Sequence, residues 1–143
     1  MFSTPVKEIM DKRKLLLAEP TMTVRKAAEA MVKRGVGAAL VVEDGRLVGI
    51  FTERDIVFRV VAPGLDTATT ALESVMTRNP KTIAPDKTYG VAMLLMHENR
   101  FRHLPVVENE VPVGIVSSRS ALDPDLEEFV FEERRRRHLQ QKR

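Results

Sequence analysis

A chain of 143 residues with 43% hydrophobic and 30% charged residues has the size and balance of one globular domain with a real core. The absence of cysteine excludes disulfides, thiolate zinc sites and a cysteine nucleophile. The first residues lack the apolar run of a signal peptide, and no segment is long enough to span a membrane. We therefore expect a cytoplasmic protein without membrane contact.

The formal net charge of +3 is concentrated at the C-terminus. Residues 134–143 contain six of the 23 Lys and Arg residues and no acid, which leaves 17 basic against 20 acidic residues in the rest of the chain. The body is therefore slightly acidic, which argues against a basic binding face. Because only 5% of the residues are aromatic and none is Trp, we do not expect nucleic acid as a partner.

The first elements along the chain are two helices. Thr4-Pro5 opens a short helix over residues 6–10. Apolar residues at i, i+3, i+4 and i+7 then predict an amphipathic helix that begins at Val24. Thr23 is its expected N-cap, and Gly35 stands where a left-handed residue would end it.

A β-hairpin and a further helix follow. Residues 38–42 and 47–51 are short apolar segments that predict two strands. Asp44-Gly45 between them is a strong signal for a two-residue hairpin turn. The next helix is expected from about Glu53 to Val61, before the Pro63-Gly64 break.

The second half of the chain repeats the first. Residues 23–57 align without a gap with residues 88–122 at a shift of 65, and residues 6–10 match residues 72–76 at a shift of 66. Thr70 and Glu73 predict a capping box for the short helix of the second copy. Two copies of one unit of about sixty residues are thus the dominant feature of the sequence.

The repeat predicts the domain organisation. We expect repeat 1 with its N-terminal helix in residues 1–66, repeat 2 in residues 67–122, and a basic C-terminal helix in residues 123–143. A helix–hairpin–helix unit cannot cover both faces of its small sheet alone. Two copies that pack sheet against sheet can do so, which predicts an α/β (α+β) fold with a pseudo-twofold pair of repeats.

This order of elements, with two motifs, resembles a tandem CBS-domain pair, also called a Bateman module. The motifs are "GIFTERDIV" (49–57), with Gly, two hydrophobic residues, Thr, two variable residues and Asp, and "RFRHLPVV" (100–107), with a basic pair before Leu-Pro-Val. The resemblance covers roughly residues 5–122. It implies a regulatory module without catalytic activity that binds an adenine nucleotide (AMP, ADP, ATP or NAD(H)) and forms a homodimer. The downstream protein partner is unknown.

Thr52 and Asp55 have two possible roles. As N-cap and N3 residues of a helix they form an acidic variant of the capping box, and the spacing alone favours this role. The same carboxylate can also accept the hydroxyls of a ribose, and the free N–H groups of a helix start suit phosphate. The resemblance implies that Asp55 binds ribose, that Thr52 binds ribose or phosphate, and that Ile50 forms the pocket wall.

Arg102 and His103 are two basic groups at the entrance of a predicted strand. Taken alone, they are expected to be an ordinary exposed pair. The resemblance implies that they bind phosphate and face Asp55 from the other repeat. It further implies that adenine lies against Pro80 and Lys81, with Phe101 as an apolar wall.

The complementary site of the other two half-motifs has weaker chemistry. Ser120 replaces the aspartate of the motif, and Gly37 and Ala38 align with the basic pair. A serine cannot accept a diol as an ionised carboxylate does. We therefore predict a weaker or empty second site, whose residues would be Val36, Ala38, Ile115 and Ser117.

The remaining features predict neither an enzyme nor a metal site. The three histidines show no metal-binding spacing, and the sequence contains no P-loop or nucleophile-elbow motif. In the C-terminal helix, Leu126, Phe129 and Val130 share one face, which we expect to dock on the module or on a second chain. This leaves a rival hypothesis: a structural dimerisation module that binds no small molecule and acts through its basic C-terminal helix on a protein or nucleic acid.

Overall fold

The computed structural model describes residues 2–13, 15–118 and 122–141, and the side chains of the last segment from residue 129 onwards. The first part of the chain forms four helical segments and three strands: α1 (Val6–Ile9), β1 (Leu17–Ala18), α2 (Val24–Arg34), β2 (Ala38–Glu43), β3 (Arg46–Thr52), α3 (Glu53–Asp55) and the π-helix η1 (Ile56–Val61). The second part repeats this order: the 3-10 helix η2 (Leu72–Ser74), β4 (Thr77–Arg78), α4 (Tyr89–Asn99), β5 (His103–Glu108), β6 (Val111–Ser117) and α5 (Leu122–Gln141).

The predicted helix α2 and the predicted hairpin of the first repeat are confirmed. The helix expected from about Glu53 to Val61 is α-helical only over Glu53–Asp55 and continues as a π-helix. Thr23 caps α2, since its hydroxyl accepts a hydrogen bond from the backbone N of Lys26 at 3.3 Å, and Gly35 ends the helix with φ 66°. Strands β2 and β3 form an antiparallel hairpin. Asp44 and Gly45 both have positive φ, as a type I′ turn requires. With β1 parallel to β2 and β4 beside β3, the sheet has the order β1-β2-β3-β4.

The second repeat has the same plan with less favourable turn residues. Thr88 caps α4, and Arg100 takes the left-handed position that Gly35 takes in the first repeat. The hairpin of β5 and β6 turns at Asn109 and Glu110, both with positive φ. A glutamate in that conformation is strained, because its Cβ crowds the backbone.

The two repeats exchange their short helices. Val6 of α1 lies fully buried in the core of the second repeat, and its backbone N donates to Lys87 O at 2.7 Å. Leu72, Val75 and Met76 lie in the core of the first repeat in the same way.

The predicted capping box of Thr70 and Glu73 is wrong. η2 is capped by Ala71 without a side-chain hydrogen bond. The chain here runs along residues 20–24 instead, so that Thr70 O accepts from Val24 N at 2.9 Å and Glu73 N donates to Pro20 O at 3.0 Å.

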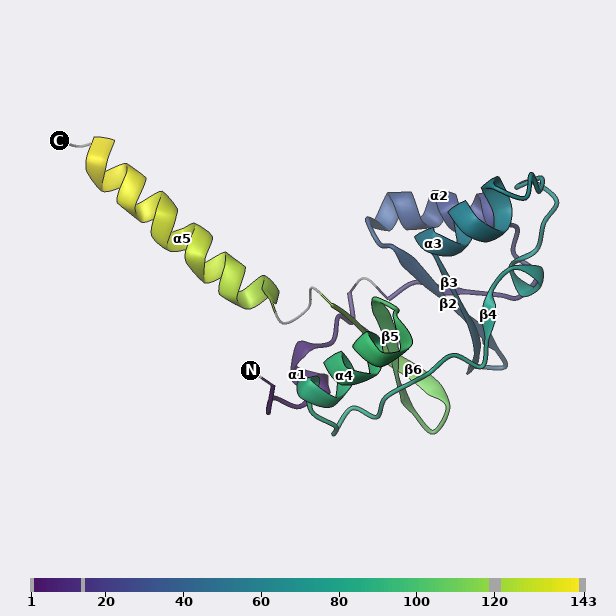
Figure 1. Cartoon of the computed structure of the whole chain (residues 1–143), viewed down its shortest axis with the longest axis horizontal. Coiled ribbons are helices and arrows are strands. Elements are labelled where there is room, and N and C mark those ends of the chain that lie inside the picture. Colours follow the sequence, from purple (N-terminus) through teal and green to yellow (C-terminus); the bar gives the residue numbers. More distant parts are fainter. Residues whose placement is uncertain (1, 14, 119–121, 142–143) are drawn as a thin grey trace.

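The two sheets meet between the repeats (Figure 1). Ala38, Leu40 and Ile50 of the first sheet form a buried apolar cluster, against which Ile115 of the second sheet packs. The hairpins also touch through the backbone, where Leu47 N donates to Glu110 O at 2.9 Å. The predicted α/β fold with two pseudo-twofold repeats and a C-terminal helix is confirmed.

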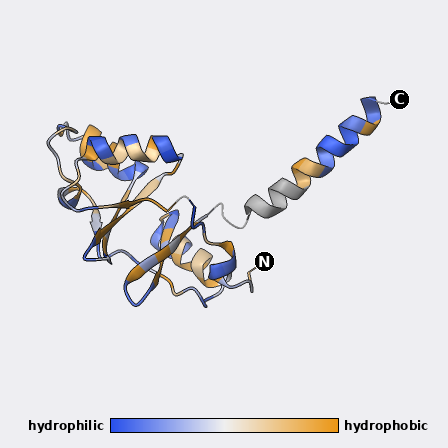
Figure 2. Cartoon of the chain, turned by 180° about the vertical axis from the view of Figure 1, so that it is seen from behind, coloured by the Kyte–Doolittle hydropathy of each residue, from blue (hydrophilic) through white to orange (hydrophobic). Residues whose placement is uncertain are grey.

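Helix α5 extends away from both repeats (Figure 1), with an apolar stretch followed by a hydrophilic end (Figure 2). Phe129 and Phe131 are 62% and 66% exposed. The described part of this helix therefore does not dock on its own module, one of the two sites where docking was predicted. The Leu126 side chain lies outside the described residues, and docking on a second chain stays a prediction. No helix in the described ranges combines the length and apolar character needed to cross a bilayer.

Candidate functional site

The site begins where β3 ends and α3 starts. Asp55 Oδ2 accepts hydrogen bonds from the backbone N of Thr52 at 2.9 Å and from its hydroxyl at 3.2 Å. The Thr52 hydroxyl in turn accepts from Asp55 N at 3.4 Å, which completes a capping box. The predicted capping role of the pair is therefore confirmed. Asp55 is also the one charged residue among the described residues that is buried, with a side chain only 10% exposed.

Arg59 binds this carboxylate from the next turn. Its Nε lies 3.5 Å from Asp55 Oδ1, and its Nη1 donates to the carbonyl oxygens of Val75 and Met76 at 3.2 and 3.1 Å. The arginine thereby joins the start of α3 to the segment that precedes β4. It lies in the π-helix η1, a type of helix that is frequent at functional sites.

The second repeat reaches this region through His103. An ideal Cβ built on Gly37 would lie 3.3 Å from His103 Nε2 and 2.5 Å from Glu53 Oε1. The imidazole and the Glu53 carboxylate therefore converge on the same small space above Gly37. Since Glu53 is the residue directly after Thr52, His103 of repeat 2 lies beside the first turn of the repeat 1 motif. That Arg102 and His103 face Asp55 stays a prediction.

The apolar wall and the segment expected to bind adenine are connected through β4. Ile50 is buried and pairs with Thr77, while Asn79 N donates to Val48 O at 3.2 Å. Pro80 and Lys81 follow at once, the first half-buried and the second exposed. The chain at residues 79–81 thus leaves the sheet next to the strand that carries Ile50.

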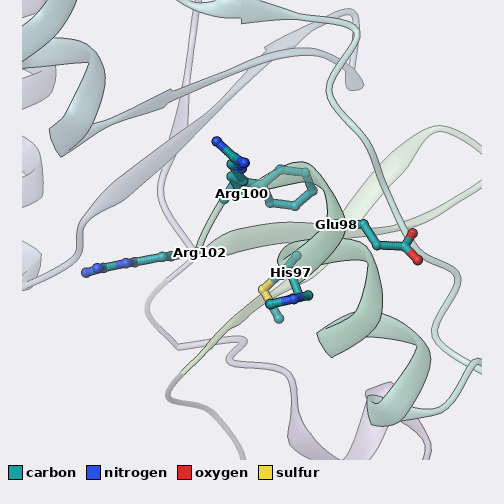
Figure 3. A pocket seen from close by; sticks show the side chains of 6 residues that line it. His97, Glu98, Arg100 and Arg102 are labelled. Atoms are coloured by element: carbon teal, nitrogen blue, oxygen red, sulfur yellow. The ribbon is translucent and has the colours of Figure 1, made fainter.

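Phe101 and Arg102 line an open cleft of about 650 Å³ at the end of α4, together with Met96, His97, Glu98 and Arg100. In Figure 3, Arg100 and Arg102 lie on one side of the turn after α4, and Glu98 points to the other side. Neither Thr52 nor Asp55 lines this cleft. Because its lining comes from the second repeat alone, we regard the cleft as a neighbour of the cross-repeat site rather than its centre.

The residues predicted for the second site lie mostly in apolar packing. Ala38 and Ile115 belong to the cluster between the sheets, and Val36 packs against the core of the first repeat. Ser117 pairs with His103 in the hairpin of the second repeat, and Ser120 lies outside the described residues. Within the described ranges, no group of three or more His, Asp or Glu side chains is arranged to hold a metal ion.

Sequence reasoning overlooked Glu53 and Arg59. Arg59 stands four residues after Asp55, a spacing that brings opposite charges together on a helix. The ion pair could therefore have been predicted from the sequence. Glu53 gave no such signal, because its position depends on Gly37 and on a histidine fifty residues further along the chain.

Comparisons with known proteins identify the fold and its family. The CBS domain family matches the chain twice, over residues 6–62 and 72–124. The CBS domain-containing protein CBSCBSPB1 of Arabidopsis thaliana is 42% identical over 108 residues, which are 76% of this chain and 20% of that protein. The chain therefore spans about a fifth of the length of this relative.

Solved structures agree with this assignment. The crystal structure of an uncharacterized conserved protein from Pyrococcus horikoshii has a TM-score of 0.81 at 34% identity, with 87% of this chain and 94% of that chain covered. The CBS domain pair of protein MJ0100, in complex with 5′-methylthioadenosine and S-adenosyl-L-methionine, has a TM-score of 0.76 at 29% identity, with 84% and 98% covered. The chain therefore belongs to the CBS-domain family, as a tandem pair of CBS domains followed by a C-terminal helix.

Proposed function

We propose that this CBS-domain pair is a non-catalytic regulatory module that binds an adenine nucleotide or a related adenosine derivative between its two repeats. AMP, ADP, ATP and NAD(H) are the expected ligands. Asp55 accepts the ribose hydroxyls, Thr52 assists at the ribose or phosphate, and Ile50 forms the wall. Arg102 and His103 bind the 5′ substituent, while Pro80, Lys81 and Phe101 border the base.

The main support for this proposal is that His103 of the second repeat lies close to the first turn of α3. The ribose-binding motif of one repeat and the basic pair of the other are far apart in sequence, yet His103 Nε2 and Glu53 Oε1 border the same space at Gly37. A carboxylate also offers about four lone-pair sites. The described contacts of Asp55 leave acceptor capacity for a sugar hydroxyl. The ligand complex of MJ0100 supports an adenosine-containing ligand.

Calorimetric titration of nucleotide-free protein with AMP, ATP, NADH and 5′-methylthioadenosine tests the proposal. We expect saturable binding at about one site per chain. Asp55→Asn should weaken it by about 10- to 100-fold, because hydrogen bonds to a charged acceptor are typically worth about 1.5–3 kcal/mol. Thr23→Ala is the control for helix capping, since it removes the side-chain cap of α2, away from the site.

The rival reading is a structural dimerisation module that binds no small molecule. It is favoured by the capping box, which is complete without any ligand. Under this hypothesis neither the unmodified protein nor Asp55→Asn gives binding heat, and the substitution only loosens the start of α3. If none of the four ligands gives binding heat or a thermal shift, the proposed function is refuted and the structural dimerisation module is favoured.

We further infer a homodimer from the exposed apolar side chains of the helices. Val57, Phe58 and Val61 of η1 are 56%, 60% and 64% exposed, although each is a large hydrophobic residue. Apolar groups that cluster on one exposed surface commonly mark a protein interface. A regulatory signal in such a dimer requires that the ligand bind one arrangement of the two chains more tightly than another.

A further inference from the structure

The outer surface of α4 is apolar although it is exposed. Val91 and Leu94 stand three residues apart, on one face of the helix, and are 43% and 55% exposed. Phe2, which is 62% exposed, extends this surface, because its backbone O accepts from Gly90 N at 2.9 Å. An ideal Cβ on Gly90 would lie 3.3 Å from Phe2 Cβ. We call Phe2, Val91 and Leu94 the α4 patch.

The same positions of the first repeat are polar. At the shift of 65 residues that relates the repeats, the α4 patch corresponds to Thr67, Lys26 and Glu29. The backbones agree at this place, since Arg25 N donates to Thr67 O at 3.0 Å as the matching bond of α4 does. The fold that both repeats share therefore does not require apolar side chains here. Their presence in the second repeat points to a surface that another chain covers.

Helix η1 carries an exposed apolar surface with a charge at its end. We call its exposed residues Val57, Phe58 and Val61 the η1 patch. Arg54 lies over the Phe58 ring, 4.4 Å from the centroid, at the N-terminal end of this patch. Glu98 stands one turn beyond Leu94, at the C-terminal end of the α4 patch. Within the described part of the chain, neither Arg54 nor Glu98 forms an ion pair.

The two patches match in length and in charge. Arg54 and Val61 are seven residues apart, and so are Val91 and Glu98. If η1 and α4 pack antiparallel, Arg54 meets Glu98 at one end of the contact, and Val61 meets Val91 at the other. A pairing of like with like sets each charge against the same charge or against an apolar residue. Only the unlike pairing therefore gives both the apolar and the charged groups a complementary partner.

We propose that the homodimer forms by unlike contacts, in which the η1 patch of each chain packs on the α4 patch of the other and Arg54 lies beside Glu98 of the partner subunit. A twofold axis makes this contact twice and leaves no patch open, so that assembly stops at two chains. The inference rests on the homodimer proposed above and names the second surface of its interface.

The absence of native cysteine permits a direct test by disulfide formation. Phe58→Cys and Leu94→Cys are prepared as separate proteins, mixed under reducing conditions to exchange chains, and then oxidised. We expect a cross-linked dimer from the mixture but not from either protein alone, because a disulfide requires Cα atoms within about 7 Å. Phe58→Cys mixed with Glu29→Cys is the matched control, since Glu29 is the counterpart of Leu94 in the first repeat. The control mixture should not cross-link.

Charge reversal gives an independent test. Arg54→Glu and Glu98→Arg should each weaken dimerisation about tenfold in sedimentation equilibrium, because each dimer contains the contact twice. The double variant should recover most of the affinity, since the reversed charges again face opposite charges. All these side chains are exposed, and unchanged circular dichroism checks that the variants fold.

The outcomes separate this inference from the homodimer on which it rests. The unlike pairing is overturned if the mixture of Phe58→Cys and Leu94→Cys gives no cross-link, if either protein cross-links alone, or if the control cross-links equally. A double charge variant no tighter than the single ones overturns it too. If the unmodified protein is then a dimer by light scattering, the homodimer stands without this arrangement. A monomeric protein overturns both, while calorimetry tests the nucleotide site separately.

Discussion

Replacement of Arg59 by Gln should destabilise the protein measurably, because this one side chain joins η1 to α3 and to the segment before β4. Its guanidinium contacts the Asp55 carboxylate and two main-chain carbonyl oxygens of the segment before β4. A hydrogen bond to a charged group is worth about 1.5–3 kcal/mol when well buried. The Arg59 side chain is 49% exposed, so water competes for these contacts.

The expected loss follows from these contacts. We assign about 0.5–1 kcal/mol to each carbonyl hydrogen bond after this discount, and about 0.5 kcal/mol to the ion pair. The free energy of unfolding should therefore fall by about 1.5–2.5 kcal/mol. For a chain of this size that corresponds to a decrease in Tm of roughly 5–10 °C.

Urea unfolding followed by far-ultraviolet circular dichroism is the suitable assay, since the chain has no Trp and a single Tyr. The m-value should stay the same, because the surface exposed on unfolding does not change. Arg54→Gln is the control: it removes a guanidinium that stacks on Phe58, worth about 0.5–1 kcal/mol. A loss for Arg59→Gln no greater than that of the control would refute the reasoning.

A double-mutant cycle with Asp55→Asn separates the contacts of Arg59. The coupling energy should be about 0.5 kcal/mol, because one partner of the ion pair is half exposed. The remaining effect of Arg59→Gln should persist without the Asp55 charge, since it comes from the carbonyl groups. Coupling that accounted for the entire loss would show that the carbonyl contacts contribute nothing.

The remaining predictions concern packing and assembly. Gly49→Ala should lower the free energy of unfolding in urea by about 1–3 kcal/mol, because the added Cβ would collide with the Met76 side chain. In a background of Met76→Ala, the same substitution should cause no further loss of stability. An additive loss in that pair would contradict the contact. Phe58→Glu should convert the proposed homodimer to a monomer in size-exclusion chromatography with light scattering while the circular dichroism stays unchanged. An unaltered mass would exclude η1 from the interface.

Much of the fold was predictable because its signals are local. The capping of α2 and α4 by Thr23 and Thr88 requires only residues three positions apart, and the hairpin at Asp44-Gly45 requires only the turn itself. The gapless repeat then supplied the pairing of the two halves. The predicted box of Thr70 and Glu73 failed because a distant segment, residues 20–24, occupies the backbone groups of this stretch.

The candidate site was predictable to a similar extent and for the same reason. The capping geometry of Thr52 and Asp55 follows from their spacing, so it was correctly anticipated. The contribution of Glu53 depends on the missing side chain of Gly37 and on the approach of His103 from the other repeat. Contacts between side chains on separate repeats have no periodicity that a single sequence displays, so these had to be read from the structure.

The exchange of short helices affects how this chain folds during synthesis and whether it can be divided into two folded halves. During synthesis the first repeat lacks part of its core until residues 72–76 have left the ribosome. Helix α1 likewise cannot pack until α4 and β5 of the second repeat have been synthesised. A protease cut or a cloning boundary between residues 66 and 67 would deprive the first half of the core residues Leu72, Val75 and Met76. The second half would lose Val6 from its core, with Ile9 and Met10 that pack against it. Folding should therefore be one cooperative transition across residues 2–118, and two separately expressed halves should recover their structure only after mixing.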